Sequence, residues 1–214
     1  EMLRSLVGSE MCIRDSLTRY TAEALDSLQR LYPDRYKHWI ELIPGRGHHI
    51  DYSPTTPWLK QHVRNPYPKH FCWENFEMDG RYRQGFYNLR VEQRSNADSN
   101  TRTRYTLDIE SNQISLAIDE VTYRTTEIDP QWGIELKFTK TYQPAQRGKV
   151  TIYLCSELVD LDKPVTLTVN GRTAFKGRVK PDVKHLVNSC ATFFDPQRLY
   201  PAAIEVDLET LEQL

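Results

Sequence analysis

The sequence predicts an α+β fold, in which a short mixed segment precedes a longer, mostly antiparallel β-sandwich. Apolar residues recur at helical spacing between Thr18 and Tyr32, and apolar and polar residues alternate between Tyr36 and Ile43. From Lys69 onward, many short alternating segments are separated by turn residues, as in all-β domains. We therefore divide the 214 residues into the ranges 1–16, 17–66 and 67–214.

The mixed segment is predicted to contain a helix, a strand and a second helix. The first helix ends before Pro33, because the residue that precedes a proline avoids the helical conformation. The strand over 36–43 stops at Pro44. Thr55 or Thr56 is suited to cap the second helix, with Pro57 at its first position.

Two hairpins are predicted in the longer segment. Strands 104–109 and 113–118 flank Ser111-Asn112, and strands 165–169 and 173–179 flank Asn170-Gly171. The second turn is the stronger signal, since asparagine and glycine both tolerate a positive φ. The other predicted elements are strands near 71–76, 84–92, 121–126, 134–139, 149–155 and 203–207, and a short helix over 182–189.

The loop after the strand over 36–43 carries a candidate catalytic residue. Gly45-Arg46-Gly47 leaves space beside the next side chain, which is His48. With an ordinary pKa of about 6.5, a histidine in such a loop can both take up and return a proton.

The order helix, strand, Gly-x-Gly-His, helix resembles the last βα unit of the α/β-hydrolases, in particular their prolyl-oligopeptidase and esterase-like branch. The resemblance covers roughly residues 18–63 and implies that His48 is the histidine of a Ser–acid–His triad, with His49 as the second choice. It implies cleavage of a small ester or peptide substrate through an acyl-enzyme, without a cofactor or a metal. Asp51 fits a turn better than the acid of the triad.

The family's nucleophile motif, Gly-x-Ser-x-Gly, is absent from the sequence. We therefore expect the C-terminal piece of a serine hydrolase, inactive as given, whose partner is the missing N-terminal catalytic part of its own chain. If so, the strand over 36–43 has few or no sheet partners. The second half, around 150–171, is similar to the small β-sandwich appended to some large bacterial hydrolases. The compartment stays open because the true N-terminus is expected to be missing, and a secreted or periplasmic location in a bacterium is the expectation.

Residues 6–15, Leu-Val-Gly-Ser-Glu-Met-Cys-Ile-Arg-Asp, resemble the conceptual translation of a transposase-based sequencing adapter. We expect the range 1–16 to be non-native, joined to the coding sequence during assembly of metagenomic reads. It is therefore excluded from the prediction of the fold.

Composition excludes several classes of partner. Charged residues make up 27% of the chain and the net charge is −1, which gives no electrostatic footprint for nucleic acid or an anionic membrane. The sequence contains no apolar run near the roughly 20 residues of a membrane span. Once Cys12 is assigned to the adapter, three widely spaced cysteines favour buried free thiols over a disulfide framework, although one pair plus a free thiol also fits.

Other interpretations of the same residues stay open. His48, His49 and Asp51 lack the spacing of a zinc site, whereas His70, Cys72 and Glu74 alternate on one strand face and permit one geometrically. The four tryptophans can line a sugar-binding platform or simply fill the core. The alternative to a hydrolase fragment is a non-enzymatic β-sandwich, either a binding module or a structural accessory domain. An exposed row of aromatic residues on one sheet face would favour the binding module.

Overall fold

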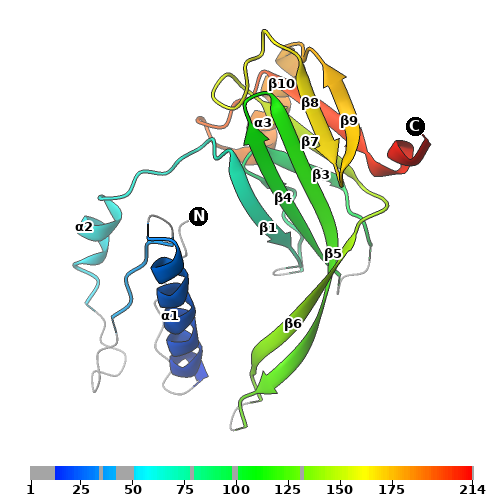
Figure 1. Ribbon diagram of the computed structural model, residues 1–214. Helices are drawn as coiled ribbons and strands as arrows, with labels where there is room; N and C mark the ends of the chain where they lie inside the picture. The colour runs from blue at the N-terminus through cyan, green and yellow to red at the C-terminus, as the bar shows by residue number, and fades with distance from the viewer. Residues whose placement is uncertain are drawn as a thin grey trace. The chain divides into compact units, whose positions relative to one another are not determined.

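The computed structural model describes residues 13–33, 36–41, 51–77, 80–97, 101–130 and 133–213, and strands predominate in it (Figure 1). Its helices are α1 (Ile13–Leu31), α2 (Thr55–Leu59) and α3 (Val183–Phe193), followed by the 3-10 helix η1 (Leu208–Gln213). The strands are β1 (His70–Asn75), β2 (Gly85–Phe86), β3 (Leu89–Gln93), β4 (Arg102–Glu110), β5 (Gln113–Ile128), β6 (Glu135–Pro144), β7 (Lys149–Leu154), β8 (Val165–Val169), β9 (Arg172–Gly177) and β10 (Ala202–Asp207).

The predicted α+β fold class is wrong, because the protein is mostly β and one of its sheets is mixed. The terminal βα unit of a hydrolase sheet is also missing from the described residues: 36–41 form no strand and pair with none. An alternating pattern stabilises a strand only when a neighbour satisfies its backbone N–H and C=O groups. The strand that was predicted to lack sheet partners is therefore not a strand over 36–41, and its remaining residues lie outside the described ones.

Contacts divide the chain into two compact units. The first comprises residues 1–64 and 124–139, and the second comprises residues 65–123 and 140–214. Within the first unit, α1 buries Leu25, and most of the other side chains over 19–31 are exposed. The second unit contains nearly all of the buried apolar residues, and the site described below lies within it.

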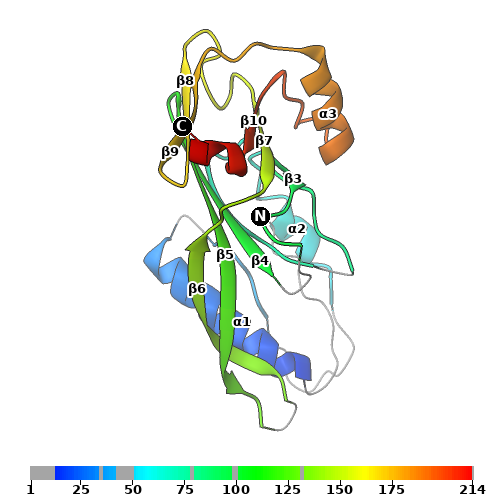
Figure 2. The same ribbon diagram turned by 90° about the vertical axis from the view of Figure 1, so that its right-hand side faces the viewer.

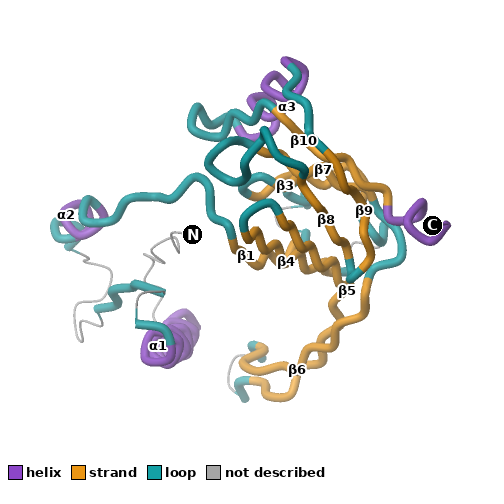
Figure 3. The backbone as a smooth tube through the Cα atoms, turned by 45° about the horizontal axis from the view of Figure 1, so that its top comes forward, coloured by secondary structure: helices purple, strands orange, loops and turns teal. Residues whose placement is uncertain are grey.

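Two sheets build the second unit (Figure 3). The larger has the strand order β1-β4-β5-β8-β9, with β6 also paired to β5, and the smaller has the order β10-β7-β3-β2. The pairing of β5 with β8 is parallel, while β4 with β5 and β3 with β7 are antiparallel. Side chains from both sheets enter one hydrophobic core, which includes Tyr105, Leu107, Ile114, Leu116, Ile118, Leu89, Ile152, Leu154, Leu167 and Ile204.

Both predicted hairpins are confirmed. Glu110 pairs with Gln113 across the first turn, and Asn170 and Gly171 have φ values of 48° and 79° in the second. Such positive values match the twist of a two-residue hairpin. The strand predicted to begin anew at Val121 is instead a continuation of β5, because Asp119 and Glu120 stay in the ladder and pair with Arg104 and Thr103 of β4.

Helix α3 extends four residues beyond the predicted 182–189. Asp182 caps its start by accepting a hydrogen bond from the Lys184 N–H at 2.9 Å, and Phe194 ends it in the left-handed region. The helix packs on the smaller sheet, where the Phe193 ring meets the Tyr153 ring of β7 edge to face at 5.7 Å. Gly85 of β2 leaves room for that ring.

Candidate functional site

The candidate site lies on the outward face of the larger sheet. Along β1 and β4, residues with buried and exposed side chains alternate, so Phe71 and Tyr105 point into the core. The residues between them point outward. Register places Glu74 beside Arg104, and Arg104 beside Asp119, so this face carries charge across three strands.

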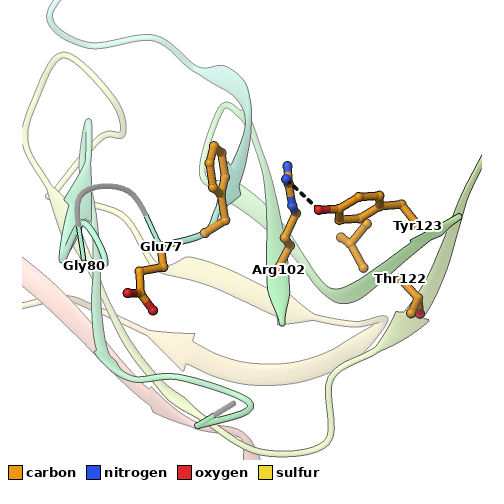
Figure 4. A pocket seen from close by; sticks show the side chains of 7 residues that line it. Glu77, Gly80, Arg102, Thr122 and Tyr123 are labelled. Carbon is orange, nitrogen blue, oxygen red and sulfur yellow. Dashed lines mark hydrogen bonds between the residues drawn. The ribbon is translucent and has the colours of Figure 1, made fainter. Parts of the chain in front are cut away.

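Arg102 is the centre of the site. Its Nη1 donates to Glu74 Oε1 at 3.2 Å. Its Nη2 donates to the Tyr123 hydroxyl at 3.0 Å (Figure 4). The guanidinium carbon lies 4.3 Å from the centroid of the Phe76 ring and 4.4 Å from that of Tyr123. Two rings within this distance stabilise the cation and hold it in one orientation. Lys140 donates to the other oxygen of Glu74.

Arg104 forms the second part of the charged face. Its Nη2 and Nε donate to Asp119 Oδ2 at 2.7 and 3.2 Å, and its guanidinium carbon lies 3.6 Å from the centroid of the Tyr142 ring. Burial lowers the pKa of Arg104, but the hydrogen bonds and charge of Asp119 outweigh it, and the net shift is upward. Arg104 is thus fixed as a permanent cation beside the site.

An open pocket of about 550 Å³ borders Arg102. It is lined by Phe76, Glu77, Gly80, Arg102, Val121, Thr122 and Tyr123. Figure 4 shows Glu77 on the opposite side of the pocket from Tyr123. The cations Arg102 and Lys140 are balanced by the carboxylates Glu74 and Glu77, so the pocket offers aromatic surface and hydrogen-bonding groups without an excess of either charge.

The predicted catalytic residues His48 and His49 lie outside the described residues, so their catalytic role stays a prediction. Asp51 is described and acts as a turn residue, as expected: its Oδ1 accepts a hydrogen bond from the Ser53 N–H at 2.9 Å.

The candidate metal ligands on β1 share a face but do not converge. The His70 Nδ1 lies 2.9 Å from Asp108 Oδ1, the Cys72 sulfur accepts from Thr106 at 3.6 Å, and Glu74 binds two cations. Over the whole described part of the chain, no group of three or more metal-ligating side chains comes together. The zinc interpretation therefore has no structural support in these ranges.

His38, which the sequence patterns did not single out, has both ring nitrogens engaged. Nδ1 lies 2.8 Å from the Tyr36 carbonyl oxygen and Nε2 lies 2.9 Å from Asp26 Oδ1. The hydrogen bond to the Tyr36 carbonyl, followed by the hydrogen bond and the charge of Asp26, raises the pKa of His38 against the effect of burial. Two acceptors favour the doubly protonated ring, which is suited to a structural ion pair and not to a general base.

The tryptophans form no common sugar-binding platform among the described residues. Trp73 lies in the second unit and stacks on the rings of Phe86 and Tyr105. In the first unit, the ring centroids of Trp39 and Trp58 are 6.4 Å apart. Trp132 is outside the described residues. The aromatic residues that do reach a pocket are Phe76 and Tyr123. The sequence patterns did not mark a site here, and the alternation along β4, which turns Arg102 and Arg104 outward, is the signal that could have indicated one.

Comparison with known proteins gives no match, whether to a protein family, to a curated protein or to a solved structure. Among the described helices, none has the length and apolar character needed to cross a bilayer.

Proposed function

We propose that residues 65–123 and 140–214 form a non-enzymatic binding module whose ligand is a neutral carbohydrate. The observation that carries the proposal is the open pocket beside Arg102, where a rigid stack of a guanidinium and two rings meets a balanced set of charges. The exposed aromatic residues on one sheet face, Tyr123 and Tyr142, are the feature that favours a binding module over a purely structural domain.

The chemistry of the pocket suits a sugar ring. The apolar face of a pyranose stacks on an aromatic side chain, while its hydroxyls accept from a guanidinium and donate to a carboxylate. Tyr123 supplies the aromatic ring, Arg102 supplies the guanidinium, and Glu77 supplies the carboxylate. A polyanion is disfavoured, because Glu74 and Glu77 offset the nearby cations.

Calorimetric titration of the full chain with soluble neutral oligosaccharides tests this proposal. We expect binding that Tyr123→Ala weakens by roughly tenfold or more, about 1.4 kcal/mol or above. Tyr52→Ala is the matched control, since Tyr52 is an exposed tyrosine that does not line the pocket. Glu77→Gln should weaken binding without changing stability. Equal affinity of the two tyrosine variants, or no binding by the wild type, would refute the assignment.

Serine-hydrolase parentage is a separate proposal, which rests on the Gly45-Arg46-Gly47-His48 motif alone. The mostly-β fold lends it no support. Its test is to read the source DNA upstream of Leu17. If that DNA encodes a Gly-x-Ser-x-Gly motif, His48→Ala in the complete enzyme should abolish ester hydrolysis, while His49→Ala should retain most of it. An ordinary start codon directly before Leu17 would contradict the proposal.

A further inference from the structure

A second stack of an arginine and a tyrosine lies next to the pocket, on the same face of the larger sheet. Arg104 follows Arg102 by two residues on β4, a distance of about 7 Å along a strand, so both side chains emerge on the outward face. The Arg104 guanidinium carbon lies 3.6 Å from the centroid of the Tyr142 ring of β6. Arg104 and Tyr142 therefore repeat the arrangement that Arg102 makes with Tyr123 at the pocket.

The two stacks are neighbours because β6 runs beside β5. Strand β5 lies between β4 and β6 (Figure 2), and the Thr141 hydroxyl of β6 donates to the Thr122 carbonyl of β5 at 3.5 Å. Tyr142 and Tyr123 are the next residues on these two strands. Of the two tyrosines, Tyr123 lines the pocket and Tyr142 lies outside it. The aromatic surface of this face thus extends beyond the pocket.

Tyr142 is both held in place and accessible. The Arg104 guanidinium, which covers one face of the ring, is itself fixed by two hydrogen bonds to Asp119 Oδ2. Tyr142 nevertheless stays 42% exposed, compared with 37% for Tyr123. A ring that is already ordered loses little conformational freedom when a ligand stacks on it, so more of the contact energy is left for binding.

The charges beside the two tyrosines are paired within the face. Asp119 binds Arg104, while Glu74 binds both Arg102 and Lys140. A ligand that passes from one tyrosine to the other therefore meets ion pairs and not a field of one sign. This favours an uncharged chain over an acidic or a basic one.

We propose that the ligand of this face is an extended neutral oligosaccharide, with one unit on Tyr123 at the pocket and another unit on Tyr142. The inference rests on the carbohydrate-binding function proposed above, and it adds a second subsite to it. Two weak contacts on one chain strengthen each other, because the first contact holds the second unit at a high effective concentration. A chain too short to span both tyrosines uses one subsite only, so affinity should depend on chain length.

Calorimetric titration with sugars of increasing length tests the second subsite. The probes are the cello-, xylo-, manno- and malto-oligosaccharides, each from the single sugar to the hexamer. Within a series that binds, we expect the affinity of the wild-type chain to rise by roughly tenfold or more from the shortest member that binds to the longest.

Replacement of the outer tyrosine separates the two subsites. Tyr142→Thr removes the ring and leaves a residue that strands accept well, so the chain should still fold. We expect this variant to lose most of the gain with chain length, while its affinity for the shortest member that binds changes far less. Phe138→Thr is the matched control, because Phe138 is a similarly exposed aromatic residue of β6, 45% exposed, and should keep the wild-type gain.

The second subsite and the pocket fail by different results. An affinity that does not grow with chain length, or an equal gain in Tyr142→Thr and the wild type, would overturn the second subsite and leave the pocket as proposed. Equal weakening of short and long members by Tyr142→Thr would overturn it as well. If the wild-type chain binds no member of any series, the carbohydrate function itself is refuted, and the second subsite with it.

Discussion

At the scale of single residues, Asn170 shows how one side chain ties a hairpin to the rest of the larger sheet. Its Oδ1 accepts from the Ile118 N–H at 2.8 Å, and its Nδ2 donates to the carbonyls of Ile118 and Ala145, both at 3.2 Å. The residue also holds a φ of 48°, which asparagine tolerates better than most residues. A turn residue is therefore a cross-link between β8, β5 and the segment that follows β6.

We expect Asn170→Ala to lower the free energy of unfolding by about 1–3 kcal/mol, since it removes these hydrogen bonds and leaves alanine in the left-handed region. Asn170→Gly tolerates the same backbone conformation, so it should lower the free energy of unfolding by less than Asn170→Ala. The difference between the two variants separates the backbone strain from the lost hydrogen bonds. Urea denaturation measures both. Equal stability of the alanine variant and the wild type would show that solvent replaces the lost bonds.

Cys155 differs from the other described cysteines in its surroundings. It is 3% exposed, and burial, followed by its hydrogen bond with Glu157, raises the pKa of its thiol to about 12. Because the thiolate is the reactive form, Cys155 should resist alkylation by iodoacetamide at about pH 8, while the exposed Cys72 and Cys190 react. Mass spectrometry of the alkylated chain checks this, and rapid modification of Cys155 in the folded protein would contradict it.

At the scale of elements, β2 and α3 approach each other more closely than most side chains permit. A Cβ at Gly85 would lie 2.6 Å from a ring carbon of Phe193 and 3.2 Å from Cγ2 of Thr192. The Phe193 ring is itself packed between Tyr153 and Tyr200, so it cannot easily move aside. Contact between helix and sheet thus depends on this glycine.

We expect Gly85→Ala to destabilise the protein by about 1–3 kcal/mol through overpacking. Gly177→Ala in β9 is the matched control, because its Cβ would meet only Phe175, at 3.6 Å, in ordinary contact. Thermal denaturation of the two variants measures the difference. If both variants melt at the wild-type temperature, the close approach has no energetic consequence.

At the scale of the whole molecule, the core contains titratable groups that must stay neutral. Burial raises the pKa of Tyr105 and of Tyr200 well above the ordinary 10.0, as it raises that of Cys155 above 9.0. Each folded pKa lies above its unfolded value, so these groups contribute stability that is fully present below about pH 9 and is lost as the pH rises toward the folded values.

Stability should therefore fall progressively between about pH 9 and about pH 11, since the unfolded chain releases protons that the folded chain retains. Chemical denaturation at a series of pH values measures the free energy of unfolding across this range. In the Cys155→Ala variant, that free energy should fall less steeply just above pH 9. A free energy of unfolding that does not change over this interval would contradict the assignment.

Sequence patterns predicted much of the second unit and little of the first. The hairpins at Ser111-Asn112 and Asn170-Gly171 depend on local turn chemistry and strict alternation, which are readable along the chain. The strand over 36–43 depends on a neighbour that no local pattern can supply, and 36–41 are not a strand. The fold class was wrong for the same reason, because it extended a local helix–strand pattern into a sheet.

The sequence by itself determined the hairpin turns and the alternation that sorts inward from outward residues on β4. Only the tertiary structure decided that Phe76, Arg102 and Tyr123 meet at one pocket, that β5 pairs in parallel with β8, and that Phe193 of α3 packs on Tyr153. Local preferences act between residues a few positions apart, whereas the site joins positions 76, 102 and 123. Such separations close only when the whole core packs.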